Sequence, residues 1–297
     1  MLKKKIVVNE VFESIDESLI EEGIPIANRY MKAIGEVSQF FGDVPIPISP
    51  DSLLPNNEFG NQLCVWLDDW YDKKYGKLQH IKSDLGFLYQ KFRGDLWHYR
   101  VPSFYGNCNF FIDKDLTVLG ANNETNILRM SQNMTQAYVN SLEEKELTQL
   151  IDSYGNALEV WDIFSCWSLT KIPFCQSIKA DLCTIQTQLD TQRMDYAQAR
   201  WAYLQCAEKI LKAWLLKAGL TEKELKNKYG HSIHKLVNAF NLHYKENLSL
   251  NGLESIKCSA GARYGDENFT SDDIIDAQEW LFKLIKTIGF EPTLATI

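Results

Sequence analysis

The stretch that decides the fold is residues 196–217, which read YAQARWAYLQCAEKILKAWLLK. Apolar side chains recur in it at intervals of three and four residues, which predicts one broad apolar stripe along an α-helix. Glu208 and Lys212 stand four residues apart, in the order that favours a surface ion pair, and we expect both to lie away from the stripe. Gly219 follows at the position of a C-terminal helix cap. The stretch therefore predicts a long amphipathic helix whose charged residues face solvent.

Three further helix signals follow this stretch. Thr221 and Glu224 form a capping-box pattern, which predicts a short helix. Gly230 precedes a helix whose buried face lies within residues 233–240. The last helix covers residues 271–288, with a hydroxyl residue at its start and two aspartates in its first turn. The C-terminal part is therefore expected to be a bundle of three or four packed helices.

The preceding part of the chain mixes helical and extended patterns. Helical spacing is found at residues 11–40, 58–75, 81–93, 125–140, 143–165 and 176–190. A proline-rich connector is expected at 44–55, and Trp97–Val101 and Asn109–Ile112 are predicted to be a β-hairpin or two neighbouring strands. We therefore expect a mainly α chain that is α+β overall. An α+β domain of unknown type would cover 1–175, and a helical bundle would cover 176–297.

Length and composition are those of an ordinary globular protein. The chain has 297 residues, of which 45% are hydrophobic and 24% are charged, and this balance excludes a disordered or collagen-like chain. Thirty-one basic and 39 acidic side chains give a formal net charge of -8. Such an acidic average disfavours a protein that coats nucleic acid or an anionic membrane.

Targeting signals and cysteine spacing predict a cytoplasmic protein. The apolar run after the N-terminal lysines is too short for a signal peptide, and no stretch approaches the roughly 18 apolar residues of a membrane-spanning helix. Seven cysteines form an odd set without a CxxC pair. We therefore expect reduced thiols, no structural metal, no cofactor and no membrane association.

Positive charge is concentrated in one segment of this acidic chain. Residues 200–245 contain nine basic and three acidic side chains, with five tryptophans and tyrosines among them. A basic, aromatic helical segment fits contact with the phosphates of a nucleotide or RNA, and Lys209 and Lys212 are candidates for that contact. The same segment fits equally well an ion-paired contact with the acidic domain of its own chain.

Three short runs in the last third of the chain have the order and spacing of a known family. They are Ala207–Leu215, Gly230–Val237 and Ala262–Tyr264. Together they resemble the signature helix, the glycine–histidine helix start and the arginine–tyrosine turn of the HEPN domain family. The resemblance covers about residues 193–290, and it implies a compact α-helical bundle.

The resemblance also implies a two-fold dimer and one of two functions. We expect a homodimer through the helices at 195–217 and 271–288. Many HEPN proteins are metal-independent ribonucleases, with an arginine followed four to six residues later by a histidine. Others bind nucleotides or RNA, or act as partners of a nucleotidyltransferase. Between residues 193 and 290 no arginine has a histidine at that spacing, so we expect a non-catalytic nucleotide- or RNA-binding or dimerisation module in prokaryotic stress response or defence.

One arginine–histidine pair at the required spacing lies outside the matched region, at Arg93 and His98. In a ribonuclease toxin His98 would act as general base on a ribose 2′-hydroxyl, and Arg93 would stabilise the charge on phosphorus. Alternatively, the two residues flank a helix-to-strand junction and share no role. Thirteen aromatic residues from Trp66 to Phe111 fit either a small core or a pocket for a planar ligand. Strand alternation places Arg100 on the same face as His98, as a candidate ligand-binding residue.

Four more residues are candidates for ligand binding. His231 and His234 stand three apart on one predicted helix, as a metal-binding pair would, but no third ligand is nearby in sequence. The resemblance instead assigns His231 to a helix start. Arg263 and Tyr264 precede the last helix, whose N-terminus attracts anions such as phosphate. The aspartates in its first turn oppose that attraction.

Overall fold

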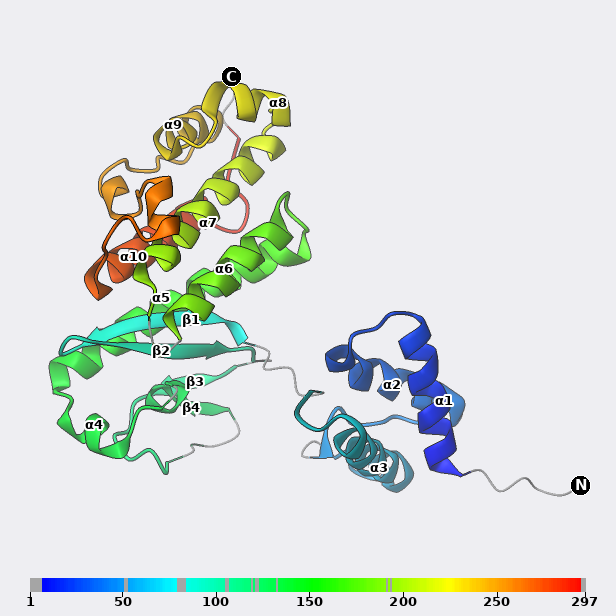
Figure 1. The fold of residues 1–297 in the computed structure, drawn as a ribbon. Helices are drawn as coiled ribbons and strands as arrows, with labels where there is room; N and C mark the ends of the chain where they lie inside the picture. Colours follow the sequence, from blue (N-terminus) through cyan, green and yellow to red (C-terminus); the bar gives the residue numbers. More distant parts are fainter. Residues whose placement is uncertain are drawn as a thin grey trace, which may run out of the picture. The chain divides into compact units, whose positions relative to one another are not determined.

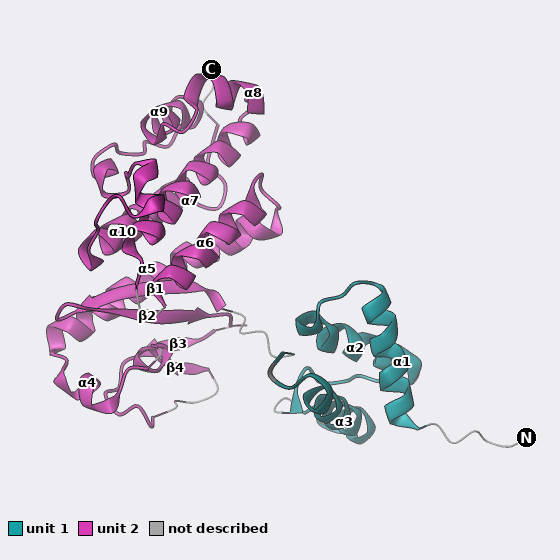
Figure 2. Cartoon of the chain, viewed as in Figure 1, with its two compact units in different colours: residues 1–83 teal, residues 84–297 magenta. Residues whose placement is uncertain are grey.

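The chain divides into two compact units. A computed structural model describes residues 7–50, 53–78, 84–104, 107–118, 120, 123–131, 133–190, 192 and 194–294. Unit 1 comprises Met1–Ser83 and unit 2 comprises Asp84–Ile297 (Figure 2). The boundary predicted between residues 175 and 176 thus falls inside unit 2, at the start of a helix.

The described elements of unit 1 are all helical. They are α1 (Val8–Glu21), α2 (Ile26–Phe40), α3 (Glu58–Tyr75) and a 3₁₀ turn at Gly76–Leu78 (Figure 1). The single helix predicted over 11–40 is two helices, because Gly23 adopts a positive φ of 73° and Pro25 restarts the helix. The predicted connector at 44–55 contains no α-helix in its described residues, and α3 has the bounds that the sequence predicts.

The core of unit 1 encloses a carboxylate. Asp16 on α1 is fully buried and accepts a hydrogen bond from the Tyr71 hydroxyl at 3.0 Å. The Tyr75 hydroxyl also donates to Asp16, and the Lys74 ammonium lies 3.1 Å from it. These donors compensate the cost of burying a charged group and link α1 to α3. The surrounding apolar side chains are Phe12, Leu19, Ala33, Val37, Leu63 and Leu67.

Unit 2 combines short strands with a bundle of helices (Figure 1). Its strands are β1 (Asp84–Phe92), β2 (Asp95–Pro102), β3 (Asn109–Phe111) and β4 (Glu124–Asn126). Its helices are α4 (Gln136–Ser141), α5 (Glu144–Leu169), α6 (Cys175–Leu189), α7 (Tyr196–Lys217), α8 (Glu222–Glu224), α9 (Ile233–His243) and α10 (Ser271–Ile288). The predicted fold class, mainly α and α+β overall, is confirmed.

The strands β1 and β2 form an antiparallel hairpin. Arg93 and Gly94 make its two-residue turn, and their φ angles of 51° and 96° fit a type I′ turn. The helix predicted over residues 81–93 is therefore wrong for 84–92, which form β1, while 81–83 lie outside the described residues. The consecutive residues Phe87–Tyr89 are all buried, so β1 lacks the alternation that marks a half-buried strand.

Two other predictions in this region need correction. The predicted strands at 97–101 and 109–112 exist, but they do not pair with each other: β2 pairs with β1, and β3 pairs in parallel with β4. The helix predicted near 125–140 is largely replaced by β4 and a 3₁₀ turn at Ile127–Met130, so that only α4 is α-helical.

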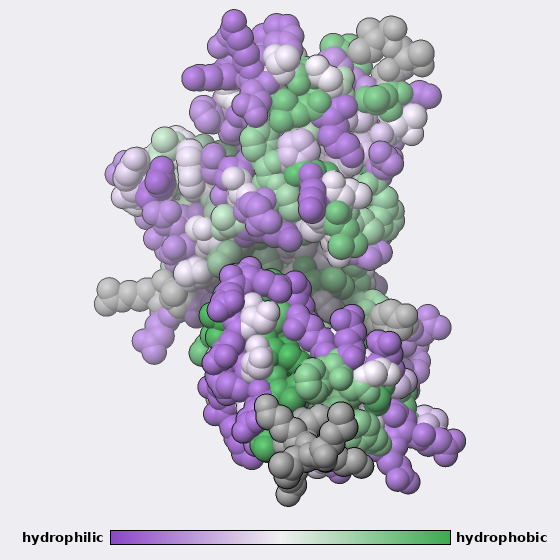
Figure 3. Space-filling model, turned by 90° about the vertical axis from the view of Figure 1, so that its right-hand side faces the viewer, coloured by the Kyte–Doolittle hydropathy of each residue, from purple (hydrophilic) through white to green (hydrophobic). Residues whose placement is uncertain are grey.

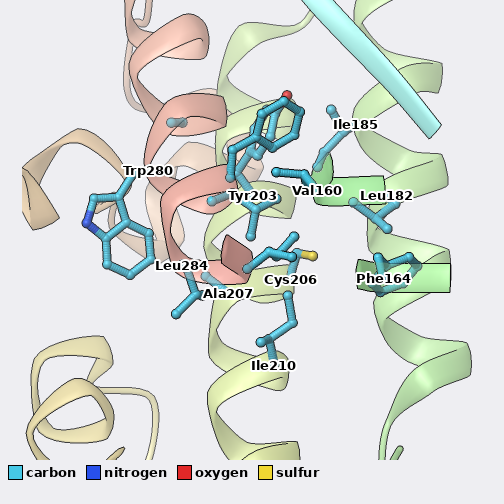
Figure 4. Close-up of a cluster of buried hydrophobic side chains, with 14 of the residues drawn as sticks. Val160, Phe164, Leu182, Ile185, Tyr203, Cys206, Ala207, Ile210, Trp280 and Leu284 are labelled. Carbon is cyan, nitrogen blue, oxygen red and sulfur yellow. The ribbon is translucent and has the colours of Figure 1, made fainter. Parts of the chain in front are cut away.

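The central helix of unit 2 is α7. It packs against α6, α9 and α10, and most of its residues are buried. Figure 4 shows the core that α7 shares with α5, α6 and α10, formed by Val160, Phe164, Leu182, Ile185, Tyr203, Cys206, Ala207, Ile210, Trp280 and Leu284. The capping signals predicted for this part are confirmed, because Thr221 and Glu224 form a capping box and Thr270 caps α10.

Candidate functional site

The buried carboxylate of Glu208 on α7 contacts two of the candidate residues. Glu208 is only 4% exposed, although we expected it to face solvent. Its Oε1 accepts a hydrogen bond from Lys212 Nζ at 2.7 Å, one turn further along α7. His231 Nδ1 lies 3.0 Å from Oε1 and 3.2 Å from Oε2. The structure thus brings Lys212 and His231 together on one carboxylate.

Local backbone signals place His231 beside Glu208. The capping box at Thr221–Glu224 starts α8, and the following π-helical turn at Leu225–Tyr229 ends at Gly230. Gly230 has a φ of 55°, a conformation that glycine adopts without steric cost. Ser232 then caps α9 with its side-chain oxygen. His231 lies between this turn and this cap, with 85% of its side chain exposed.

The contact with Glu208 determines which imidazole nitrogen of His231 is free. An ionised carboxylate only accepts hydrogen bonds, and Glu208 already accepts one from the Lys212 ammonium. The proton of neutral His231 therefore sits on Nδ1, and Nε2 keeps its lone pair. Such a nitrogen can accept a proton, coordinate a metal or attack an electrophile.

Lys209 is also engaged inside the chain. Its Nζ donates a hydrogen bond to Asp181 Oδ2 on α6 at 2.6 Å. Burial raises the pKa of Asp181, and the hydrogen bond from Lys209 opposes that rise. Both lysines that were candidates for phosphate contact are thus held by acidic residues of unit 2.

Other lysines of residues 200–245 stay exposed at the end of α7, in α8 and the turn that follows it, and at the start of α9. We call this surface the basic end, and it comprises Lys217, Lys223, Lys226, His231, His234 and Lys235. In the described part of the chain its four lysines form no ion pair, whereas the nearby Lys228 pairs with Glu224. Hydrophilic residues cover much of the upper end of unit 2 in Figure 3, where α8 lies in Figure 1.

The candidates Arg263 and Tyr264 lie at the other end of α7. They belong to a 3₁₀ turn, Ala260–Tyr264, in which the Arg263 carbonyl accepts a hydrogen bond from Gln198 near the start of α7. Arg200 is turned inward and donates to three backbone carbonyls. The 22 residues of α7 span about 33 Å at 1.5 Å per residue. Arg263 and Tyr264 therefore do not form one site with the basic end.

The structure does not bring Arg93 and His98 together. Arg93 lies in the hairpin turn, and its guanidinium forms two hydrogen bonds of 3.2 Å with Glu146. His98 stacks on Tyr89 with ring centroids 5.0 Å apart, and its Nδ1 lies 3.1 Å from Asp190. The Tyr89 hydroxyl donates to the other oxygen of Asp190 at 2.9 Å. These three side chains line a pocket of about 210 Å³, and Arg93 is not among its described lining residues.

Arg100 forms an ion pair within the hairpin. Its guanidinium makes hydrogen bonds of 2.6 to 3.0 Å with the carboxylate of Asp84, and these raise the pKa of Arg100. Asp84, Asp181 and Asp190 were not predicted as partners. No local pattern marks Asp181 or Asp190, because each meets its partner across the fold.

In comparisons with known proteins, no family model, curated protein or solved structure matches the chain. Within the described residues, no three His, Cys, Asp or Glu side chains are grouped so that they could hold a metal ion. None of the described helices is both long enough and apolar enough to cross a membrane. The resemblance to HEPN domains therefore rests on the sequence motifs alone.

Proposed function

We propose that unit 2 contains a HEPN-like module that binds the phosphates of a nucleotide or RNA through the basic end and does not cleave RNA. The observation that carries this function is the distribution of lysines. Lys209 and Lys212 are held in internal ion pairs, whereas the lysines of the basic end stay exposed and Lys235 lies in the first turn of α9. Backbone N–H groups at a helix N-terminus attract anions, and lysines contact phosphate oxygens in nucleic-acid complexes.

Fluorescence anisotropy with a labelled single-stranded RNA tests this function. The double variant Lys226→Glu/Lys235→Glu reverses two charges of the basic end. We expect its affinity to fall at least about 10-fold. The slope of log affinity against log salt concentration should become shallower by about 0.7 for each lost phosphate contact.

The matched control is Lys145→Glu/Lys179→Glu, which makes the same change of net charge on exposed residues of α5 and α6. We expect this control to bind RNA nearly as well as the parent protein. An equal loss of affinity in the two double variants would indicate a general electrostatic effect, and it would argue against a site at the basic end.

A ribonuclease that uses Arg93 and His98 is the alternative function. The contact of His98 with Asp190 and the pocket beside them favour acid–base chemistry. Arg93 is held by Glu146, which disfavours its use in the same step. Incubation with labelled RNA in EDTA separates the two functions. Cleavage that His98→Ala abolishes would support the enzyme, and intact RNA at saturating protein would support the binding module.

The HEPN resemblance also supports a homodimer through α7 and α10. Most of α7 is covered by α6, α9 and α10 of its own chain, so the exposed face of α10 offers the larger free surface. Sedimentation velocity over a range of protein concentrations tests the dimer. A monomer at the highest concentration would contradict it.

A further inference from the structure

We propose that His231 is a phosphoryl acceptor, whose Nε2 takes a phosphoryl group from a small donor with a labile P–N bond, of the phosphoramidate class. This activity goes beyond the binding of a nucleotide or RNA. It is supported by the contact of His231 with Glu208, the exposure of its ring and the charges that surround it.

The contact with Glu208 prepares His231 to act as a nucleophile. Only 5% of the Glu208 side chain is exposed, and both of its carboxylate oxygens lie within 3.2 Å of Nδ1. Because the proton is held on Nδ1, the lone pair of Nε2 is free to attack. The carboxylate also stabilises the positive charge that develops on the ring as the new bond forms.

Exposure together with a carboxylate contact distinguishes His231 from the other described histidines. His231 is 85% exposed, whereas both ring nitrogens of His98 are buried. His234 contacts only the neutral amide of Asn238, at 3.3 Å. Among the described histidines, His231 is therefore the one that combines an exposed ring with a carboxylate on Nδ1.

The surrounding charges favour an anionic phosphoryl group over a metal cation. Lys212 binds the same carboxylate, and Lys235 lies in the first turn of α9. The N-terminus of this 11-residue helix begins directly after His231 and carries a partial positive charge. A metal ion would add positive charge to this region, whereas a phosphoryl group brings negative charge and acceptor oxygens.

The phosphoryl transfer to His231 needs neither a metal ion nor an oxidant or reductant. Nε2 of His231 attacks the phosphorus atom, and a bond between Nε2 and phosphorus forms. The P–N bond of phosphoramidate breaks at the same time, and its nitrogen, protonated at neutral pH, leaves as ammonia with the electron pair of that bond. The ring keeps its proton on Nδ1, so the resulting positive charge faces Glu208.

The experiment is to incubate the full chain with phosphoramidate and to follow the bound phosphate by ³¹P NMR and Phos-tag electrophoresis. We expect one acid-labile, alkali-stable phosphoryl group, which peptide mapping at alkaline pH locates on His231. His231→Gln should abolish the label, and its exposed position allows the variant to fold. Glu208→Gln should slow labelling about 10-fold. His243→Ala, at the end of α9, is the control that keeps the label.

Three results would overturn the proposal: no label on the parent protein, a label mapped to another residue, or undiminished labelling of His231→Gln. Circular dichroism of each variant shows whether it is folded, and the His231→Gln result decides the question even where Glu208→Gln does not fold. The assay contains no RNA, so its outcome is independent of whether the basic end binds RNA.

Discussion

The side-chain amide of Gln278 on α10 completes the hydrogen bonding of Tyr89 on β1. Oε1 of Gln278 accepts from the Tyr89 N–H at 2.8 Å, and Nε2 donates to the Tyr89 carbonyl at 2.9 Å. Trp161 on α5 supplies a similar contact, because its Nε1 donates to the Phe87 carbonyl at 2.7 Å. Since β1 is an edge of a two-stranded sheet, these side chains take the place of a third strand.

Replacing Gln278 by leucine should destabilise unit 2. The substitution nearly keeps the side-chain volume but leaves the buried N–H and C=O of Tyr89 without partners, so we expect the free energy of unfolding to fall by about 3 kcal/mol. Urea unfolding followed by far-UV circular dichroism measures this loss. Gln149→Leu, at an exposed position of α5, is the control and should change the stability by less than about 0.5 kcal/mol. Equal effects of the two variants would contradict this role of Gln278.

Gly86 should not tolerate a side chain. A Cβ atom at this position would lie 1.9 Å from the Trp161 ring, so Gly86→Ala forces the hairpin away from α5 and should cost at least about 3 kcal/mol. Gly155→Ala is the matched control, because a Cβ there has no atom within 4 Å and alanine favours the helix by about 0.5–1 kcal/mol. Thermal unfolding of both variants compares the two glycines. A stable Gly86→Ala protein would show that Trp161 moves without cost.

Asp16→Ala should loosen unit 1 and leave unit 2 unchanged. The substitution removes the acceptor of the Tyr71 and Tyr75 hydroxyls and the partner of Lys74, which should cost about 2–3 kcal/mol. Hydrogen–deuterium exchange read by mass spectrometry should become faster in α1 to α3 and stay unchanged in α7. Glu13→Ala is the control, because Glu13 also pairs with Lys74 but is about half exposed. Unchanged exchange in α1 after Asp16→Ala would refute this expectation.

Alkylation of Cys258 should depend steeply on pH. Burial raises the pKa of this thiol to about 11, and only the thiolate reacts. Because the thiolate is the minor form below that value, the rate of reaction with iodoacetamide should rise about 10-fold per pH unit between pH 8 and pH 10. Peptide mass spectrometry measures the rate, with the exposed Cys183 as the internal comparison. Rapid, pH-independent labelling of Cys258 would contradict the raised pKa.

Local signals explain which elements could be predicted from the sequence. The helices α3, α7 and α10 carry caps and apolar residues at helical spacing within one continuous segment, and their predicted bounds agree closely with the structure. The prediction fails at β1 because several of its apolar residues, from Leu85 to Phe92, stand at helical spacing. Both faces of β1 carry buried residues, so no alternation of apolar and polar residues reveals the strand.

The candidate site was only partly predictable, because its chemistry depends on contacts across the fold. The pairing of Glu208 with Lys212 follows from their spacing and is confirmed, but Glu208 is buried and Lys212 is half-buried, so the pair does not lie on the exposed face that we expected. His231 follows Glu208 by 23 residues, and the two meet because the turn at Gly230 places the start of α9 beside α7. The sequence alone indicated His231 as a candidate without revealing the carboxylate that fixes its proton.

The contact between Gln278 and Tyr89 has a consequence for how the protein is made. The two residues are 189 positions apart, so the ribosome synthesises the hairpin long before it synthesises α10. Until that last helix docks, the nascent chain presents an apolar strand edge whose peptide groups can pair with strands of other chains. We therefore expect ribosome-stalled or prematurely terminated chains that end before Ser271 to aggregate or to be retained by chaperones, however well their own helices form.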